Sequence, residues 1–214
     1  MPEPTPARAG HAGDGPLDPA VLLQASRRVD WRFLLPRPQL GATVYIGPSD
    51  PALVDALRAH ADLTIADAET LRSPTPSFDL VVLKGVPIGL VRAGRDLVRP
   101  GGWVYAEARA TLRRNAPVAA GVRPVSRWCR AFADAGLTEV TAHWHVPSHD
   151  APAFLVPLAD RGAVRLVLGR HQGSAAGRAK AAVGRVLAAA GLIELAVRDA
   201  SVLGRRPWPD EGRR

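Results

Sequence analysis

The chain has 214 residues, of which 47% are hydrophobic, and this suits one globular domain with a complete core. Its net charge of +8 comes almost entirely from arginine in a chain rich in Ala, Gly and Pro, so it is weak evidence for nucleic-acid binding. An aromatic content of 5% leaves little surface for base stacking, and we expect no nucleic-acid partner. No apolar run is long enough to span a membrane, and Cys129 is alone, so we expect a cytoplasmic protein.

The N-terminal residues 1–16 are dominated by Pro, Ala and Gly and are expected to form a disordered tail. A main domain is expected over residues 17–172, with an extension over 173–214. Apolar spacing predicts a first helix from Asp18 to about Val29. The apolar residues of Asp30–Pro36 are then expected to cover one end of the sheet.

A strand, a tight turn and a helix follow. Ala42–Ile46 reads as a strand that ends at Gly47, and Ser49 or Asp50 then caps a helix with Pro51 at its first position. Free backbone N–H groups gather at such a turn, which favours binding of a nucleotide-like ligand.

Two further short strands continue this pattern. Leu63–Ala66 ends in Asp67, about 20 positions beyond the glycine, where an acidic side chain would hold a ribose hydroxyl. Phe78–Leu83 is the next strand, and Lys84 follows it at the carboxyl end, where open α/β sheets place their chemistry.

The rest of the chain alternates between helical and strand patterns. Residues 108–125 form a connection whose arginines either face an anionic substrate or are simply solvated. The expected elements are a helix over Leu90–Val98, a strand over Trp103–Ala108 ending near Glu107, a helix from Ser126 to Ala135, strands over Leu137–Val146 and Val164–Leu168, a helix over 176–190 and a strand over Leu192–Leu203.

The histidines near residue 145 are the main candidates for acid–base chemistry. His143 and His145 are two apart on a predicted strand and share a face, and His149 follows. Imidazole suits proton transfer at pH 7, so His145 and His149 are candidate catalytic residues. No cysteine or metal-ligand spacing accompanies them, and no metal site is predicted.

Several phrases of the sequence resemble those of class I S-adenosylmethionine-dependent methyltransferases. They are the first glycine motif (Val44–Gly47), Ala66–Leu71, Ser77–Val82, and the Pro-Gly-Gly turn within Leu97–Val104. The similarity covers roughly residues 40–170. The chain departs from the family in having one glycine in the first motif, and in having one strand rather than two before the Phe-Asp strand.

The resemblance implies an α/β fold with a Rossmann-like, mostly parallel sheet, a final antiparallel strand pair and helices on both faces. It implies S-adenosylmethionine as cofactor, with Gly47 and Ser49 at its methionine part and Asp67 at the ribose; Lys84 is added by its position. The strands Leu137–Val146 and Val164–Leu168 would form the final antiparallel pair.

Three functions remain open from the sequence. The first is methylation of a small molecule such as a sugar, lipid-linked glycan or secondary metabolite. The second is a non-catalytic methyltransferase-like scaffold that has lost its cofactor and supports a partner enzyme. The third, an RNA methyltransferase, is favoured only by net charge. The extension at 173–214 is expected to extend the sheet or to form a contact with a second copy or a partner enzyme.

Overall fold

The computed structural model describes residues 23, 26–66, 71, 75–109, 124–170, 175–195, 197–209 and 211, without the side chains of 109, 175–180 and 195. The predicted tail at 1–16 and most of the connection at 108–125 therefore lie outside the described residues.

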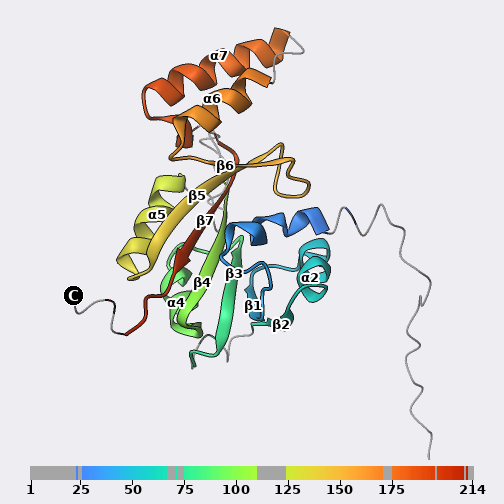
Figure 1. Ribbon diagram of the computed structural model, residues 1–214, viewed down its shortest axis with the longest axis vertical. Coiled ribbons are helices and arrows are strands. Elements are labelled where there is room, and N and C mark those ends of the chain that lie inside the picture. Colours follow the sequence, from blue (N-terminus) through green and yellow to red (C-terminus); the bar gives the residue numbers. More distant parts are fainter. Residues whose placement is uncertain are drawn as a thin grey trace, which may run out of the picture.

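Seven strands in the described part of the chain form one sheet in the order β2-β1-β3-β4-β7-β5-β6 (Figure 1). Parallel pairs join β1 to β2, β1 to β3 and β3 to β4, whereas β7 is antiparallel to both β4 and β5. The strands are β1 (Ala42–Ile46), β2 (Asp62–Ile65), β3 (Phe78–Lys84), β4 (Val98–Arg109), β5 (Thr138–Val146), β6 (Phe154–Pro157) and β7 (Asp199–Arg205).

These directions confirm the predicted methyltransferase-like α/β fold, because β1 to β5 all run the same way and only β6 and β7 oppose them. The helices are α2 (Pro51–Arg58), α4 (Leu90–Leu97), α5 (Val125–Asp134), α6 (Arg161–Arg170) and α7 (Ala175–Ala189), with the 3-10 helices η1 (Asp30–Leu34) and η2 (Ile193–Leu195).

Helices cover both faces of the sheet, as predicted. On one face, α4 and α5 bury Val91, Trp128 and Phe132 against the strands. On the other face, α2 and η1 pack against β1, β3 and β4, and the Trp31 ring stacks on Tyr105 with 3.9 Å between ring centroids. Of the apolar residues that were predicted to cover one end of the sheet, Trp31, Leu34 and Leu35 pack against this face, whereas Phe33 is exposed.

The predicted strand at Val164–Leu168 is wrong, because these residues lie in α6. Val164, Val167 and Leu168 are buried at helical spacing, and the Asp160 carboxylate accepts hydrogen bonds from the backbone N–H groups of Gly162 and Ala163. This is a helix N-cap. The antiparallel partner of β5 in the interior of the sheet is β7, from the predicted extension.

One predicted helix boundary and one predicted strand boundary also shift. Pro124, rather than Ser126, is the residue before the first turn of α5, with no side-chain cap. The predicted strand at Leu192–Leu203 begins later, at Asp199, and η2 occupies part of the preceding stretch.

The segment before β1 crosses the carboxyl ends of the parallel strands (Figure 1, blue). Its helical residues 26–28 and η1 bring Arg28 to Glu107, the antepenultimate residue of β4. Because ligands of α/β sheets bind at the carboxyl ends of the strands, this segment lies over the expected site.

Candidate functional site

The turn after β1 has the predicted form. The Leu53 N–H donates to Asp50 Oδ1 at 3.2 Å, so Asp50 rather than Ser49 caps α2, and Pro51 occupies the first turn. At Gly47 a Cβ atom would lie 2.4 Å from the Lys84 carbonyl oxygen. The glycine therefore lets the ends of β1 and β3 approach closely, as the tight turn requires.

The predicted cofactor-binding residues lie in different environments. Ser49 is exposed at the turn, whereas the Lys84 ammonium pairs with Asp50 Oδ2 and lies 3.7 Å from Glu107 Oε2. Asp67 lies outside the described residues. The structure thus brings Gly47, Ser49 and Lys84 together at the carboxyl end of β1 and β3.

A buried ion cluster joins this turn to the middle of the sheet. The Arg28 guanidinium, 2% exposed, donates to the Glu107 carboxylate, and its Nη2 lies 3.6 Å from Asp50 Oδ2. Arg28 also reaches the carbonyl of His149 and the carboxylate of Asp150. Arg28, Asp50, Lys84 and Glu107 together are called the edge cluster below.

The electrostatics of the edge cluster favour its charged forms. Burial alone would raise the pKa of Glu107, but the positive charges of His149, Arg28 and Lys84 outweigh it and lower that pKa. Burial likewise opposes the charge on Arg28, yet the carboxylate of Glu107 holds the Arg28 pKa above its ordinary value. A carboxylate and a guanidinium at the end of β4 are therefore stable as ions.

His149 is held by β7 through both ring nitrogens. Its Nδ1 lies 3.0 Å from Asp199 Oδ1, and its Nε2 lies 3.0 Å from the carbonyl oxygen of Ala200. Both partners are hydrogen-bond acceptors, and together they fix the orientation of the His149 ring. Contacts with β7 thus engage both ring nitrogens of His149.

His145 is different, because only one of its ring nitrogens has a partner. Its Nε2 lies 2.8 Å from Ser201 Oγ, while its Nδ1 is buried without a hydrogen bond. Burial, followed by the positive charges of His149 and Arg28, lowers the His145 pKa well below its ordinary value of 6.5. His145 is therefore a neutral imidazole at pH 7, and its Nδ1 is enclosed by the protein.

The two predicted halves of the site share one face of the sheet. Lys84 is paired in register with Glu107, Glu107 with Ser201, and Ser201 with His143. Four strand spacings separate β1 from β5, or roughly 19 Å at about 4.8 Å per spacing. Gly47 and His145 are therefore not neighbours, and Arg28 and Glu107 fill the space between them.

The sequence did not indicate a role for Arg28, and it placed Glu107 near the end of a strand without giving it a function. A charged residue within an otherwise apolar strand pattern is the signal that points to Glu107. The arginines of the connection at 108–125, which could face an anionic substrate, have no described side chains; they are Arg109, Arg113, Arg114 and Arg123. Among the residues that are described, no three His, Cys, Asp or Glu side chains gather as metal ligands.

Comparison with known proteins gives matches only among solved structures. No family model matches the chain, and no curated protein matches it. One similar structure is phosphoethanolamine N-methyltransferase 2 from Haemonchus contortus, at 10% identity and a TM-score of 0.46. The match covers 86% of this chain but 53% of that chain, so this chain spans about half the length of that enzyme.

Two other similar structures are matched over most of their own length. A possible histamine N-methyltransferase from Thermotoga maritima has 14% identity and a TM-score of 0.47, with 87% of this chain and 92% of that chain covered. An S-adenosylmethionine-dependent methyltransferase from Archaeoglobus fulgidus has 11% identity and a TM-score of 0.48, with 85% and 94% covered. All three TM-scores are below 0.5, and it is the strand order and directions of this chain that define its fold.

Proposed function

We propose that the chain is an S-adenosylmethionine-dependent methyltransferase that acts on a small molecule. The observation that carries this proposal is the convergence of four charged side chains from four segments at the carboxyl ends of β1, β3 and β4. Buried titratable groups that gather where α/β sheets bind their ligands are candidates for a functional site.

The residues present fit the amino-acid end of this cofactor by charge. That end carries an ammonium and a carboxylate, and the edge cluster offers two carboxylates and two cations beside the Gly47 turn. Asp50 and Glu107 would hold the ammonium, Lys84 and Arg28 the carboxylate, and Asp67 the ribose hydroxyls. When bound, the cofactor supplies an electrophilic methyl group.

The protein's own residues would exclude water, accept the released proton and orient the acceptor. Arg28 and its segment cover the carboxyl edge and exclude water, which favours a small acceptor over a folded macromolecule. His145 Nδ1 would accept the proton that an acceptor hydroxyl or amine releases. His149 would position the His145 ring, since the centroids of the two rings are 4.4 Å apart. Orientation of the acceptor would supply much of the rate enhancement.

One observation favours the second candidate, a non-catalytic methyltransferase-like scaffold. The edge cluster pairs its charges internally, Asp50 with Lys84 and Glu107 with Arg28. To bind, the ammonium and carboxylate of the cofactor would have to replace these internal ion pairs. If the internal pairs are more stable than the pairs with the cofactor, the cluster does not bind it. A scaffold would keep the fold and the cluster for stability alone.

Calorimetric titration with S-adenosylhomocysteine distinguishes the two candidates. We expect weak binding, weakened tenfold or more in Asp67→Asn because a carboxylate that bonds ribose hydroxyls is lost. Asp55→Asn removes an exposed carboxylate from α2, makes the same change in charge and serves as the control, with affinity unchanged. No heat at millimolar ligand would overturn the enzyme proposal in favour of the scaffold.

The proposed base is tested once an acceptor is identified. His145→Asn keeps a polar side chain but removes the proton acceptor, so turnover should fall about 10²–10⁴-fold with cofactor affinity unchanged. An unchanged turnover in this variant would limit His145 to a structural role.

A further inference from the structure

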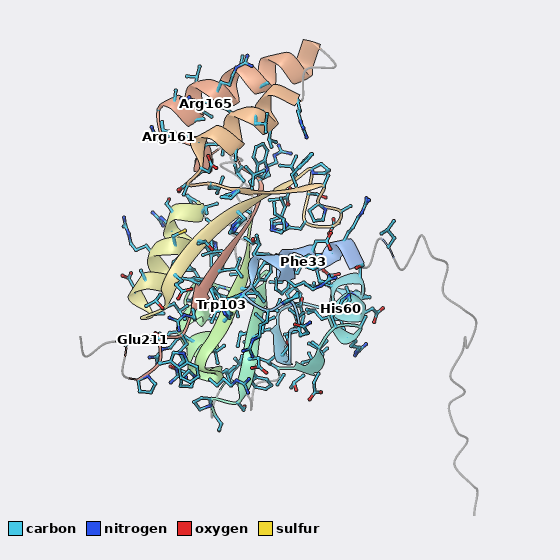
Figure 2. All side chains as sticks on the ribbon, viewed as in Figure 1. Phe33, His60, Trp103, Arg161, Arg165 and Glu211 are labelled. Carbon is cyan, nitrogen blue, oxygen red and sulfur yellow. The ribbon has the colours of Figure 1, made fainter. Side chains whose placement is uncertain are left out.

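Most of the net positive charge of the chain lies in one helical hairpin, made of α6 and α7, because this part of the sequence has no acidic residue. Residues 161–190 contain six Arg or Lys and no Asp or Glu, although the whole chain has a net charge of only +8. The rest of the sequence is therefore close to neutral. Arg161, Arg165, Arg170 and Arg185 are exposed on this hairpin, and Figure 2 shows Arg161 and Arg165 on α6.

The hairpin projects beyond the β6 end of the sheet (Figure 1). Its two helices are closely packed, since a Cβ atom at Gly184 of α7 would lie 2.7 Å from a methyl carbon of Leu168 in α6. Ala181 and Ala188 are buried on the same side of α7 as Gly184. The inner face of α7 therefore already has its partner within the chain.

The opposite face of α7 is also apolar, but it is exposed. Val183 and Val186 are 60% and 68% exposed, and they are flanked by the exposed Ala182, Ala189 and Ala190. Leu166 on α6 is 62% exposed. An exposed apolar helix face in a hairpin whose only charged residues are basic is complementary to an anionic membrane surface, because apolar side chains can enter the interface while the cations contact the headgroups.

We propose that the α6–α7 hairpin docks on the surface of a lipid bilayer that carries anionic headgroups. The arginines would contact the headgroups while Val183 and Val186 of α7 enter the interface. A second copy of the chain fits less well, because two hairpins without acidic residues repel each other. Nucleic acid fits less well because residues 161–190 contain no Phe, Trp or Tyr, and the Phe154 ring beside Arg170 comes from β6.

Peripheral binding of this kind needs no membrane-spanning segment. Within the residues that the structure describes, no helix combines the length and the apolar character that crossing a bilayer requires. The proposal is independent of the methyltransferase proposal, because the hairpin lies outside the edge cluster.

The test is co-sedimentation of the full chain with vesicles of phosphatidylcholine, with and without phosphatidylglycerol. We expect binding only to the anionic vesicles, with weaker binding at higher salt. Arg165→Gln/Arg185→Gln should weaken binding roughly fivefold for each arginine removed. Val183→Ser/Val186→Ser should also weaken it, and both pairs are exposed, so the fold should survive, as circular dichroism would verify.

The matched control removes two exposed arginines elsewhere. Arg127→Gln/Arg130→Gln on α5 makes the same change in net charge and should leave vesicle binding intact. Equal loss in this control would overturn the proposal, because net charge rather than the hairpin would then drive binding. Absence of vesicle binding would also overturn it. The proposal would also be overturned if the protein bound RNA or formed a dimer instead of binding vesicles, and if the hairpin variants lost that RNA complex or dimer.

Discussion

Arg28 donates a hydrogen bond to the carboxylate of Glu107, 79 residues away in the sequence, and both side chains are almost completely buried. The contact ties the segment before β1 to the end of β4. It sets the position of the segment that covers the carboxyl edge of the sheet, where the ligand is proposed to bind.

Replacing Arg28 with Met should destabilise the protein by about 3–5 kcal/mol, because Glu107 would then be a buried charge without its main partner. The double variant with Glu107→Gln should recover part of this loss. Urea unfolding measures both. The pKa of Glu107 is lowered in the folded state, so the cost of Arg28→Met should be full above pH 4.5 and shrink as the pH falls through the folded value. Equal costs for the single and double variants would contradict the pairing.

Gly47→Ala should destabilise the fold by about 1–3 kcal/mol, because its Cβ would overlap the Lys84 carbonyl oxygen. Gly89→Ala is the matched control, since a Cβ there has no heavy atom within 4 Å and its φ of −62° suits alanine. We expect the control to be as stable as the wild type in thermal unfolding. If the two variants melt together, the close approach of β1 and β3 is not as described.

His145 should remain neutral at pH values where an ordinary histidine is already protonated, because burial and neighbouring charges lower its pKa. The unfolded chain takes up this proton below about pH 6.5 and the folded chain does not, so stability should fall as the pH drops below that value. His145→Asn should flatten this dependence. Imidazole NMR signals of His145 that titrate near 6.5 would contradict the prediction.

Arg206→Ala should loosen the C-terminal end of α4. Arg206 Nη1 donates to the carbonyl oxygen of Val98 at 2.6 Å and to that of Arg95 at 3.3 Å, where α4 ends. Losing these charge-assisted bonds should cost roughly 1.5–3 kcal/mol. The neighbouring Arg205→Ala is the control, and its loss should be smaller because its partners Glu139 and Glu211 are exposed. Urea unfolding measures both losses, and a larger loss in Arg205→Ala than in Arg206→Ala would contradict the prediction.

Local signals in the sequence were sufficient for much of the sheet. The glycine turn, the Asp50 cap and the first proline predicted the start of α2, and β-branched runs predicted β1, β3 and β5. Each of these depends on neighbours within a few positions. The valines of residues 164–168 predicted a strand, whereas these residues form α6. Their helical spacing and the N-cap at Asp160 explain why the helix is the stable structure.

The candidate site was less predictable, because its contacts join distant parts of the chain. His145 and His149 were identified, but their partners Ser201 and Asp199 lie 56 and 50 residues later, on a strand whose position the sequence did not reveal. Arg28 gave no signal of its own among so many arginines. Burial beside Glu107 is a property of the folded chain alone.

The position of β7 also limits the order in which the molecule can be completed. β7 lies between β4 and β5 in space but follows both in the sequence. While the chain is being synthesised, β4 has no neighbour on one side, and the hairpin of β5 and β6 has no strand to join. A nascent chain, or a product truncated before Asp199, would therefore expose two open sheet edges, which are sites for aggregation or chaperone binding.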